Sequence, residues 1–326
     1  MKAIVQDVYG NSDVLRLREV AQPVPGAGEV LVRVRAAGVD QGVWHLMTGL
    51  PYLLRLFGYG LKKPKVPVRG REVAGLVEAV GAGVTRFQPG DEVFGMCEGS
   101  FAEYVCAKEA LVARKPANLT FEEAAAAPIS AGTALQAVRD AGHVAVGHKV
   151  LIIGAGGGVG SFAVQIAKAF GAEVSGVCST GKVDLVHSLG ADHVIDYTRE
   201  DFAQAGVLYD VILDTAGNRP LSLLRRALTP KGVLVIVGGE GGGKLTGGFQ
   251  RSLGAPLVAL FSGQKLKALV AKENYSDLEA LTTLIEAGSV KPAVDRVFPL
   301  AEAPTAVAYL HDGKARGKVV VSISGA

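Results

Sequence analysis

Apolar and polar residues follow a two-residue period in the first third of the chain. Positions 30–37 alternate apolar and charged or small side chains, which is typical of a strand with one buried face. Another apolar run, 72–80, ends at Gly81-Ala82-Gly83, and Pro89-Gly90-Asp91 marks a further turn. Many short strands joined by glycine turns predict a barrel-like β domain over residues 1–125.

The pattern changes near residue 120. Thr120 followed by Glu122 and Glu123 is typical of a helix start. Short apolar runs then alternate with helical stretches, which predicts a parallel, doubly wound α/β domain over residues 126–271. Its predicted strands are 149–153, 173–178, 193–196, 209–214, 233–237 and 266–271. We assign 272–326, with a helix at 276–287 and a strand at 318–323, to the first domain.

Composition supports two soluble domains and excludes some function classes. The chain has 326 residues, 49% of them hydrophobic, which is enough for two buried cores. Its 34 basic and 31 acidic residues are well mixed, so we expect neither a nucleic acid nor a membrane as partner. Three scattered cysteines indicate a reducing compartment, and no long apolar segment is free of charges. We therefore expect a cytoplasmic protein.

The strongest local motif is a glycine cluster that follows the predicted strand 149–153. Gly154, Gly157 and Gly160 are spaced G-x-x-G-x-x-G, and a helix is predicted over 162–170. Glycines let the backbone approach a pyrophosphate, and the N-terminus of a helix offers free N–H donors. A strand before the loop and a helix after it make dinucleotide binding the favoured interpretation over a purely structural turn.

The end of the next strand indicates which dinucleotide binds. NAD sites usually place a carboxylate there, on the ribose hydroxyls. This chain instead has Ser179, Thr180 and Lys182, with no carboxylate before Asp184. Two hydroxyls and an ammonium suit the 2′-phosphate of NADPH, which Tyr197 is placed to cover. The alternative for Lys182 is a solvated lysine at a helix start.

Several motifs together resemble the medium-chain dehydrogenase/reductase superfamily. They are Gly70-Arg71-Glu72-Val73-Ala74-Gly75, Gly90-Asp91-Glu92-Val93-Phe94-Gly95, Phe101-Ala102-Glu103-Tyr104, the glycine loop, residues 189–196 and Gly317-Lys318-Val319-Val320. The chain is most similar to the zinc-free quinone oxidoreductases, which include enone and alkenal reductases. The resemblance implies a GroES-like β-barrel catalytic domain, a Rossmann domain, a cleft between them, and a homodimer or tetramer.

The resemblance also implies a set of cofactor contacts. The residues that match family positions around NADPH are Thr133, Gly157, Gly158, Val159, Gly160, Lys182, Tyr197, Thr215 and the segment from Val237 to Gly239.

The same comparison argues against a metal. Family positions that hold catalytic zinc match Asp40, Arg71, Glu72 and about Ile129 here, and neither arginine nor isoleucine donates to a metal. The four-cysteine structural zinc lobe is missing as well. We therefore predict no metal site, with the Arg71 guanidinium between Asp40 and Glu72 in place of zinc.

Without a Lewis acid, reduction of a conjugated acceptor is easier than oxidation of a simple alcohol. We expect NADPH-dependent hydride transfer to a small hydrophobic quinone or α,β-unsaturated carbonyl. Two alternatives stay open: a zinc-free NADP-dependent alcohol or ketone dehydrogenase, and a catalytically weak NADPH-binding protein.

No residue is a firm acid or base. Asp40, His45 and Tyr52 are the candidates, although Asp40 also suits the N-cap of a helix over 41–47, and His45 suits packing. The apolar residues of 44–57 belong partly to the core and partly to a pocket wall. The apolar segment 249–260 lines either the pocket or a subunit interface.

Overall fold

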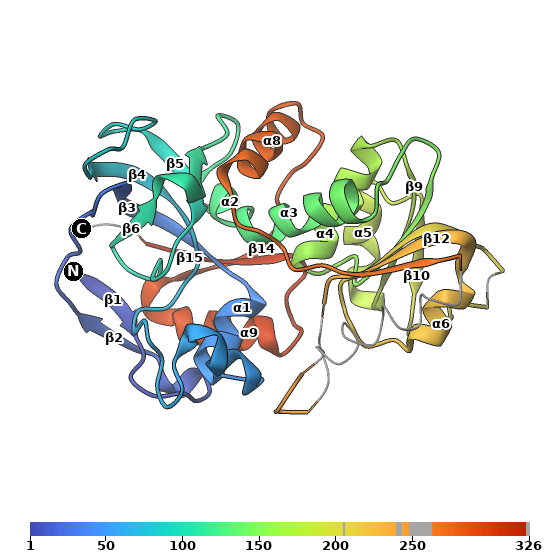
Figure 1. The fold of residues 1–326 in the computed structure, drawn as a ribbon, viewed down its shortest axis with the longest axis horizontal. Helices are drawn as coiled ribbons and strands as arrows, with labels where there is room; N and C mark the ends of the chain where they lie inside the picture. The colour runs from blue at the N-terminus through green and yellow to red at the C-terminus, as the bar shows by residue number, and fades with distance from the viewer. Residues whose placement is uncertain (205, 239–242, 248–262, 324–326) are drawn as a thin grey trace. The chain divides into compact units, whose positions relative to one another are not determined.

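The computed structural model describes residues 1–323 except 205, 239–242 and 248–262 (Figure 1). The chain divides into two compact units, Met1–Gly132 with Glu273–Gly288 and Pro292–Ala326, and Thr133–Lys272 with Ser289–Lys291. The first unit extends past the predicted boundary at 125, because Ile129 and Ser130 form hydrogen bonds to Glu72 and Lys318 of its sheet. The segment 249–260 lies entirely outside the described residues.

The first unit is built on a seven-stranded sheet of mostly antiparallel pairs (Figure 1). Its order is β14(Val294–Pro299), β15(Lys318–Ser322), β3(Glu29–Val39), β4(Glu72–Val80), β5(Glu92–Met96) and β7(Val112–Arg114), with β6(Tyr104–Lys108) also paired to β3. The predicted strands 30–37 and 72–80 are confirmed. Along β3 the side chains of Val30, Val32 and Val34 enter the core, as the alternating pattern requires. A hairpin of β1(Lys2–Val5) and β2(Arg16–Glu19) stands beside the sheet.

Short helices complete the first unit. They are α1(Gln41–Thr48), the π-helical turn η2(Arg55–Tyr59), α2(Phe121–Ala125), the start of α3(Pro128–Leu135), α8(Tyr275–Glu286), α9(Ala303–His311) and the 3₁₀ turns η1(Ser12–Val14), η3(Glu109–Leu111) and η6(Leu300–Glu302). The predicted helix start at Thr120 is a capping box. The Thr120 hydroxyl accepts a hydrogen bond from the Glu123 amide, and the Glu123 carboxylate accepts one from the Thr120 amide.

The second unit contains a six-stranded parallel sheet. Its order is β10(His193–Asp196), β9(Glu173–Cys178), β8(Lys149–Ile153), β11(Tyr209–Asp214), β12(Leu228–Ile236) and β13(Lys265–Ala268). In chain order this is 3-2-1-4-5-6, the order of a dinucleotide-binding Rossmann sheet. The connecting helical segments are η4(Gln136–Ala141), α4(Gly158–Ala169), η5(Thr180–Lys182), α5(Val183–Ser188) and α6(Leu221–Arg226) (Figure 1).

The sheet register brings three strand ends to one edge. Ile153 at the end of β8 pairs with Val177 of β9 on one side and with Asp214 of β11 on the other. Loops that follow these strands therefore gather where the strand order reverses, which is where doubly wound sheets bind ligands. No helix that the structure describes is long and apolar enough to cross a lipid bilayer.

Candidate functional site

The loop after β8 has a backbone conformation that requires glycine at two positions, because a residue with a Cβ atom would be strained or would clash there. Gly154 has φ of +84°, and a Cβ at Gly160 would lie 2.1 Å from the Gly154 carbonyl oxygen. Gly157 is the N-cap of the twelve-residue helix α4 and offers no side-chain cap. The first amides of α4, at Gly158, Val159 and Gly160, can thus donate hydrogen bonds to the oxygens of a pyrophosphate. These residues fit the phosphates of a dinucleotide.

Lys182 lies next to this loop. A Cβ placed on Gly156 would come within 2.8 Å of the aliphatic Lys182 side chain, so only glycine allows this approach. Ser179 precedes it, and the Ser179 carbonyl accepts the Lys182 amide at 2.9 Å. The turn η5 therefore holds the lysine beside the glycine loop.

The Thr180 hydroxyl, which we predicted to contact the 2′-phosphate, is bound to a carboxylate instead. Its hydroxyl donates to the Asp196 carboxylate at 2.6 Å, and Thr198 bonds the same carboxylate. These bonds, the Thr180 hydroxyl first, hold the pKa of Asp196 below its usual value. The Thr180 hydroxyl is thus already used to fix the turn, and its direct role toward a 2′-phosphate does not fit this geometry.

Sequence reasoning missed a second cation near Tyr197. The Arg219 guanidinium lies 5.6 Å from the centre of the Tyr197 ring, which is half exposed. Arg219 follows β11 after four residues, whereas Tyr197 directly follows β10. The signal was present in the sequence as an arginine just after a strand of the parallel sheet.

The other residues predicted to contact cofactor have mixed positions. Thr133 is partly buried on α3, and Val237 is partly buried at the end of β12. The Thr215 hydroxyl donates to the Ile153 carbonyl at 2.7 Å, so it braces the loop after β8. Gly239 lies outside the described residues.

In the first unit, Asp40 caps a helix. Its carboxylate accepts the Gly42 amide at 2.5 Å, so the N-cap interpretation of Asp40 is confirmed. An Nη atom of Arg71 lies 4.0 Å from the same carboxylate, and the other forms an ion pair with Glu273. Burial opposes the charge of Arg71, but Asp40 and Glu273 outweigh it and raise the arginine's pKa.

The prediction that Arg71 also pairs with Glu72 is wrong. The Glu72 carboxylate, which is fully buried, accepts a hydrogen bond from the Lys318 ammonium at 2.6 Å. The Ile129 amide donates to its other oxygen at 2.9 Å, and the Ser130 hydroxyl contacts the ammonium at 3.0 Å. Arg71 directly precedes β4 and Glu72 is its first residue, and successive residues of an extended chain point to opposite faces, so the two side chains reach different partners. Burial raises the pKa of Glu72, and the ammonium opposes that rise.

His45 and Tyr52, the other two candidates for an acid or base, both contact residues of their own segment. A ring nitrogen of His45, Nδ1, is 2.8 Å from the Leu50 carbonyl, which ties the ring to its own loop. Tyr52 is 45% exposed, and the Arg55 guanidinium lies 4.8 Å from its ring centre. Their direct role in proton transfer stays a prediction.

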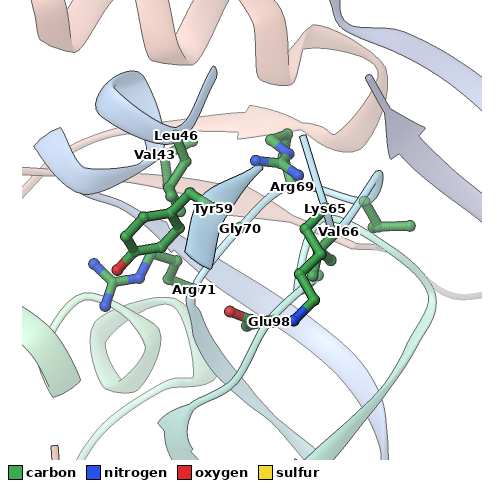
Figure 2. A pocket seen from close by; sticks show the side chains of 11 residues that line it. Val43, Leu46, Tyr59, Lys65, Val66, Arg69, Gly70, Arg71 and Glu98 are labelled. Carbon is green, nitrogen blue, oxygen red and sulfur yellow. The ribbon is translucent and has the colours of Figure 1, made fainter. Parts of the chain in front are cut away.

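The first unit has a cavity of about 360 Å³, with Arg71 in its wall (Figure 2). Its lining residues are Val43, Leu46, Tyr59, Lys65, Val66, Val68, Arg69, Gly70, Arg71, Glu98 and Gly99. Gly70 has φ of +97°, and a Cβ there would lie 2.4 Å from the Ser100 hydroxyl, so only glycine fits between the two arginines. The sequence motif that holds Gly70 thus forms a pocket wall.

Sequence comparisons agree with this architecture. Residues 26–117 match the model of the alcohol dehydrogenase GroES-like domain, and residues 189–321 match that of the zinc-binding dehydrogenases. The chain is 36% identical to a 2-methylene-furan-3-one reductase of Solanum lycopersicum, over 98% of this chain and 79% of the relative. It is 34% identical to a chloroplastic quinone oxidoreductase of Triphysaria versicolor, over 98% of both.

The chain belongs to the medium-chain dehydrogenase/reductase superfamily. Within it, the chain falls in the quinone-oxidoreductase-like branch. A quinone oxidoreductase of Coxiella burnetii superimposes with a TM-score of 0.83 at 28% identity over 99% of both chains. An NAD-dependent alcohol dehydrogenase superimposes with a TM-score of 0.85 at 30% identity over 99% of this chain and 100% of that one.

Because the chain belongs to this superfamily, the residues that match the family's zinc-ligand positions can be compared with the needs of a metal site. Among the residues that the structure describes, no group of three or more His, Cys, Asp or Glu side chains is arranged to hold a metal ion. At the matched positions, Arg71 is bound to Asp40 and Glu273, and Glu72 is bound to Lys318. Cys97 is buried, and burial raises the pKa of its thiol far above the usual range, so the thiolate that zinc requires is disfavoured.

Proposed function

We propose that this protein is a zinc-independent, NADPH-dependent oxidoreductase that transfers a hydride to a quinone or an α,β-unsaturated carbonyl compound. The observation that carries the proposal is the pairing of Arg71 with Asp40 and Glu273 at the family's metal position. An arginine held there by two carboxylates supplies a fixed positive charge without a Lewis acid. A simple ketone needs stronger polarisation than a conjugated acceptor, whose negative charge spreads over several atoms.

The second unit supplies the residues for the cofactor. The amides of Gly158, Val159 and Gly160 would bind the pyrophosphate. Lys182, with Arg219 and Tyr197, would bind the adenosine 2′-phosphate as two cations and an aromatic ring. A reduced nicotinamide, when bound, supplies the hydride. The two cations favour NADPH over NADH because only NADPH carries the charge that they pair with.

The first unit supplies the environment of the acceptor. Hydride addition to the β-carbon of an enone breaks the C=C bond and leaves an enolate, and water protonates the α-carbon. We assign no protein acid to that proton, since Asp40 caps α1 and His45 is tied to Leu50. The positive charges of the pocket stabilise the enolate oxygen.

Turnover of paired acceptors tests the proposal. NADPH oxidation should be measured with a quinone, an enone and the corresponding saturated ketone, and repeated with NADH. We expect the quinone or the enone to be reduced with a kcat/KM at least about tenfold above the ketone's, a difference of only 1.4 kcal/mol in barrier. Efficient reduction of the ketone would support the second candidate, a zinc-free alcohol or ketone dehydrogenase, which the alcohol dehydrogenase neighbour favours.

Absence of turnover with every acceptor, together with tight NADPH binding, would instead indicate a nucleotide-binding protein without catalysis. We also propose a cytoplasmic homodimer or tetramer. Some relatives are named as chloroplastic or mitochondrial proteins, so location should be determined by fractionation and assembly by light scattering.

A further inference from the structure

Arg69 is a buried cation without a counter-ion. Only 5% of its surface is exposed, and its Nε atom forms no hydrogen bond. No carboxylate of the described residues lies within ion-pair distance of its guanidinium. Charged side chains are rarely this buried unless they are paired. The backbone keeps Arg69 in place, since its amide donates to the Ile4 carbonyl and its carbonyl accepts the Phe101 amide.

The side chain lines the cavity of the first unit, where positive charge is in excess. Lys65, Arg69 and Arg71 are the cations of the lining, and Glu98 is its anion. Figure 2 shows the Lys65 side chain reaching toward Glu98, and both residues are exposed. Arg71 is already balanced by Asp40 and Glu273. Of the three lining cations, Arg69 is therefore the one that is buried and has no ion-pair partner among the described residues, and Glu98 acts on it only from beyond ion-pair distance.

The rest of the cavity wall is mostly apolar, with four aliphatic side chains and the ring and hydroxyl of Tyr59. Val43 and Leu46 come from α1, and Val66 and Val68 come from the segment before Arg69. A ligand that satisfies both features has a negatively charged group and a short apolar body. A guanidinium offers a fork of donors that matches the two oxygens of a carboxylate. An inorganic anion would pair with the charge but leave the aliphatic wall uncovered.

We propose that this cavity binds the carboxylate of a small organic acid, with Arg69 as its ion-pair partner and the valine and leucine side chains around its carbon chain. This inference rests on the proposed function: the acid is the hydride acceptor itself, an α,β-unsaturated carbonyl compound that carries a carboxylate. Arg69 then determines specificity within the acceptor site.

The proposed carboxylate pocket can be tested by measuring ligand binding in the absence of turnover. Titration calorimetry with hexanoate and with hexanamide, which differ in charge but hardly in size, needs no NADPH. We expect hexanoate to bind at least about tenfold more tightly than hexanamide, and Arg69→Met to weaken hexanoate about 10- to 100-fold while leaving hexanamide unchanged. The matched control is Lys62→Met, an exposed lysine outside the lining, which should change neither affinity.

A second variant keeps Arg69. Leu46→Glu places a carboxylate in the same cavity, where it should repel hexanoate and compete for Arg69. Three results would overturn the proposal: no binding of hexanoate, equal hexanoate affinity in the wild type and both variants, or inorganic phosphate binding as tightly as hexanoate. The last result would mean that charge alone is recognised.

A turnover assay distinguishes a failure of the carboxylate pocket from a failure of the proposed function. 4-Oxopent-2-enoate and its methyl ester differ only in the carboxylate. Each would take one hydride from NADPH and one proton from water, giving the saturated compound and NADP⁺. We expect a lower KM for the acid in the wild type and loss of that preference in Arg69→Met. Equal turnover of both without hexanoate binding removes the pocket assignment alone, and hexanoate binding without turnover of either removes the proposed reaction alone.

Discussion

The Lys318 ammonium is the counter-ion of a carboxylate that has no access to water. Glu72 and Lys318 have side chains that are 0% and 1% exposed, and their nitrogen and oxygen atoms are 2.6 Å apart. Lys318→Met removes the charge but keeps an unbranched side chain of similar length. Glu72 would then be buried with only the Ile129 amide as donor.

Breaking a buried ion pair by removing one partner typically costs about 3–5 kcal/mol, because the remaining charge is uncompensated. In a unit of this size, that loss lowers the midpoint of thermal unfolding by roughly 6–20 °C. The double variant Lys318→Met with Glu72→Gln removes both charges and should recover most of the loss. The control Lys314→Met breaks an exposed pair with Asp312 and should leave the midpoint nearly unchanged, because solvent screens such pairs.

The deficit should also depend on pH. Burial raises the pKa of Glu72, and loss of the ammonium in Lys318→Met raises it further above the unfolded value. A carboxyl group with a raised folded-state pKa contributes stability at low pH that is lost as the pH rises through that pKa. Differential scanning calorimetry from pH 5 to pH 8 should show a larger deficit at the alkaline end. Equal midpoints for Lys318→Met and Lys314→Met would refute the reasoning.

Lys182→Ala should raise the Kd for NADPH about 10- to 100-fold and leave that for NADH unchanged, measured by fluorescence titration, because a charge-assisted contact to phosphate is worth about 1.5–3 kcal/mol. Lys149→Ala, an exposed lysine at the other end of β8, is its control, and equal wild-type affinity for both cofactors would contradict the prediction. Gly160→Ala should abolish nucleotide binding since its Cβ meets the Gly154 carbonyl, whereas Gly181→Ala meets nothing and should be silent. Mass spectrometric metal analysis should find less than stoichiometric zinc, and tightly bound zinc at one per chain would overturn the metal-free mechanism.

The sequence predicted the parallel sheet well because its strands are short apolar runs with regular spacing. β8, β9, β10 and β11 have the predicted bounds. Periodicity identifies an element, and the glycine spacing identifies the turn after it, so both the sheet and the loop at Gly154 could be derived from local sequence.

The pairing of charges could not be derived in this way. Glu72 and Lys318 are 246 positions apart, and which carboxylate meets which cation depends on the faces of β4 and β15. Thr180 is a similar case, because the sequence shows a hydroxyl and only the fold shows Asp196 beside it. Arg69 escaped notice altogether, since an arginine beside a turn glycine is usually exposed.

The buried charge of Arg69, which we propose binds a ligand, should also lower the stability of the folded protein. Burial lowers the pKa of Arg69 from its usual value to about 10, although the charges of Tyr9 and Glu98 oppose the shift. Keeping the charged form buried therefore costs about 3 kcal/mol of folding free energy. Because the folded-state pKa is below the unfolded value, this cost is fully present at neutral pH and begins to fall only as the pH rises through about 10.

Arg69→Met should therefore stabilise the protein, with a rise in the unfolding midpoint of several degrees by calorimetry at pH 7, about 2–4 °C for each kcal/mol that is recovered. The control Lys62→Met removes one exposed charge and should change the free energy of unfolding by no more than about 0.5 kcal/mol. Saturating hexanoate should raise the midpoint of the wild type, because the ligand supplies the missing counter-ion, but not that of Arg69→Met. A variant less stable than the wild type would mean that Arg69 has a structural partner, and the anion pocket would lose its physical basis.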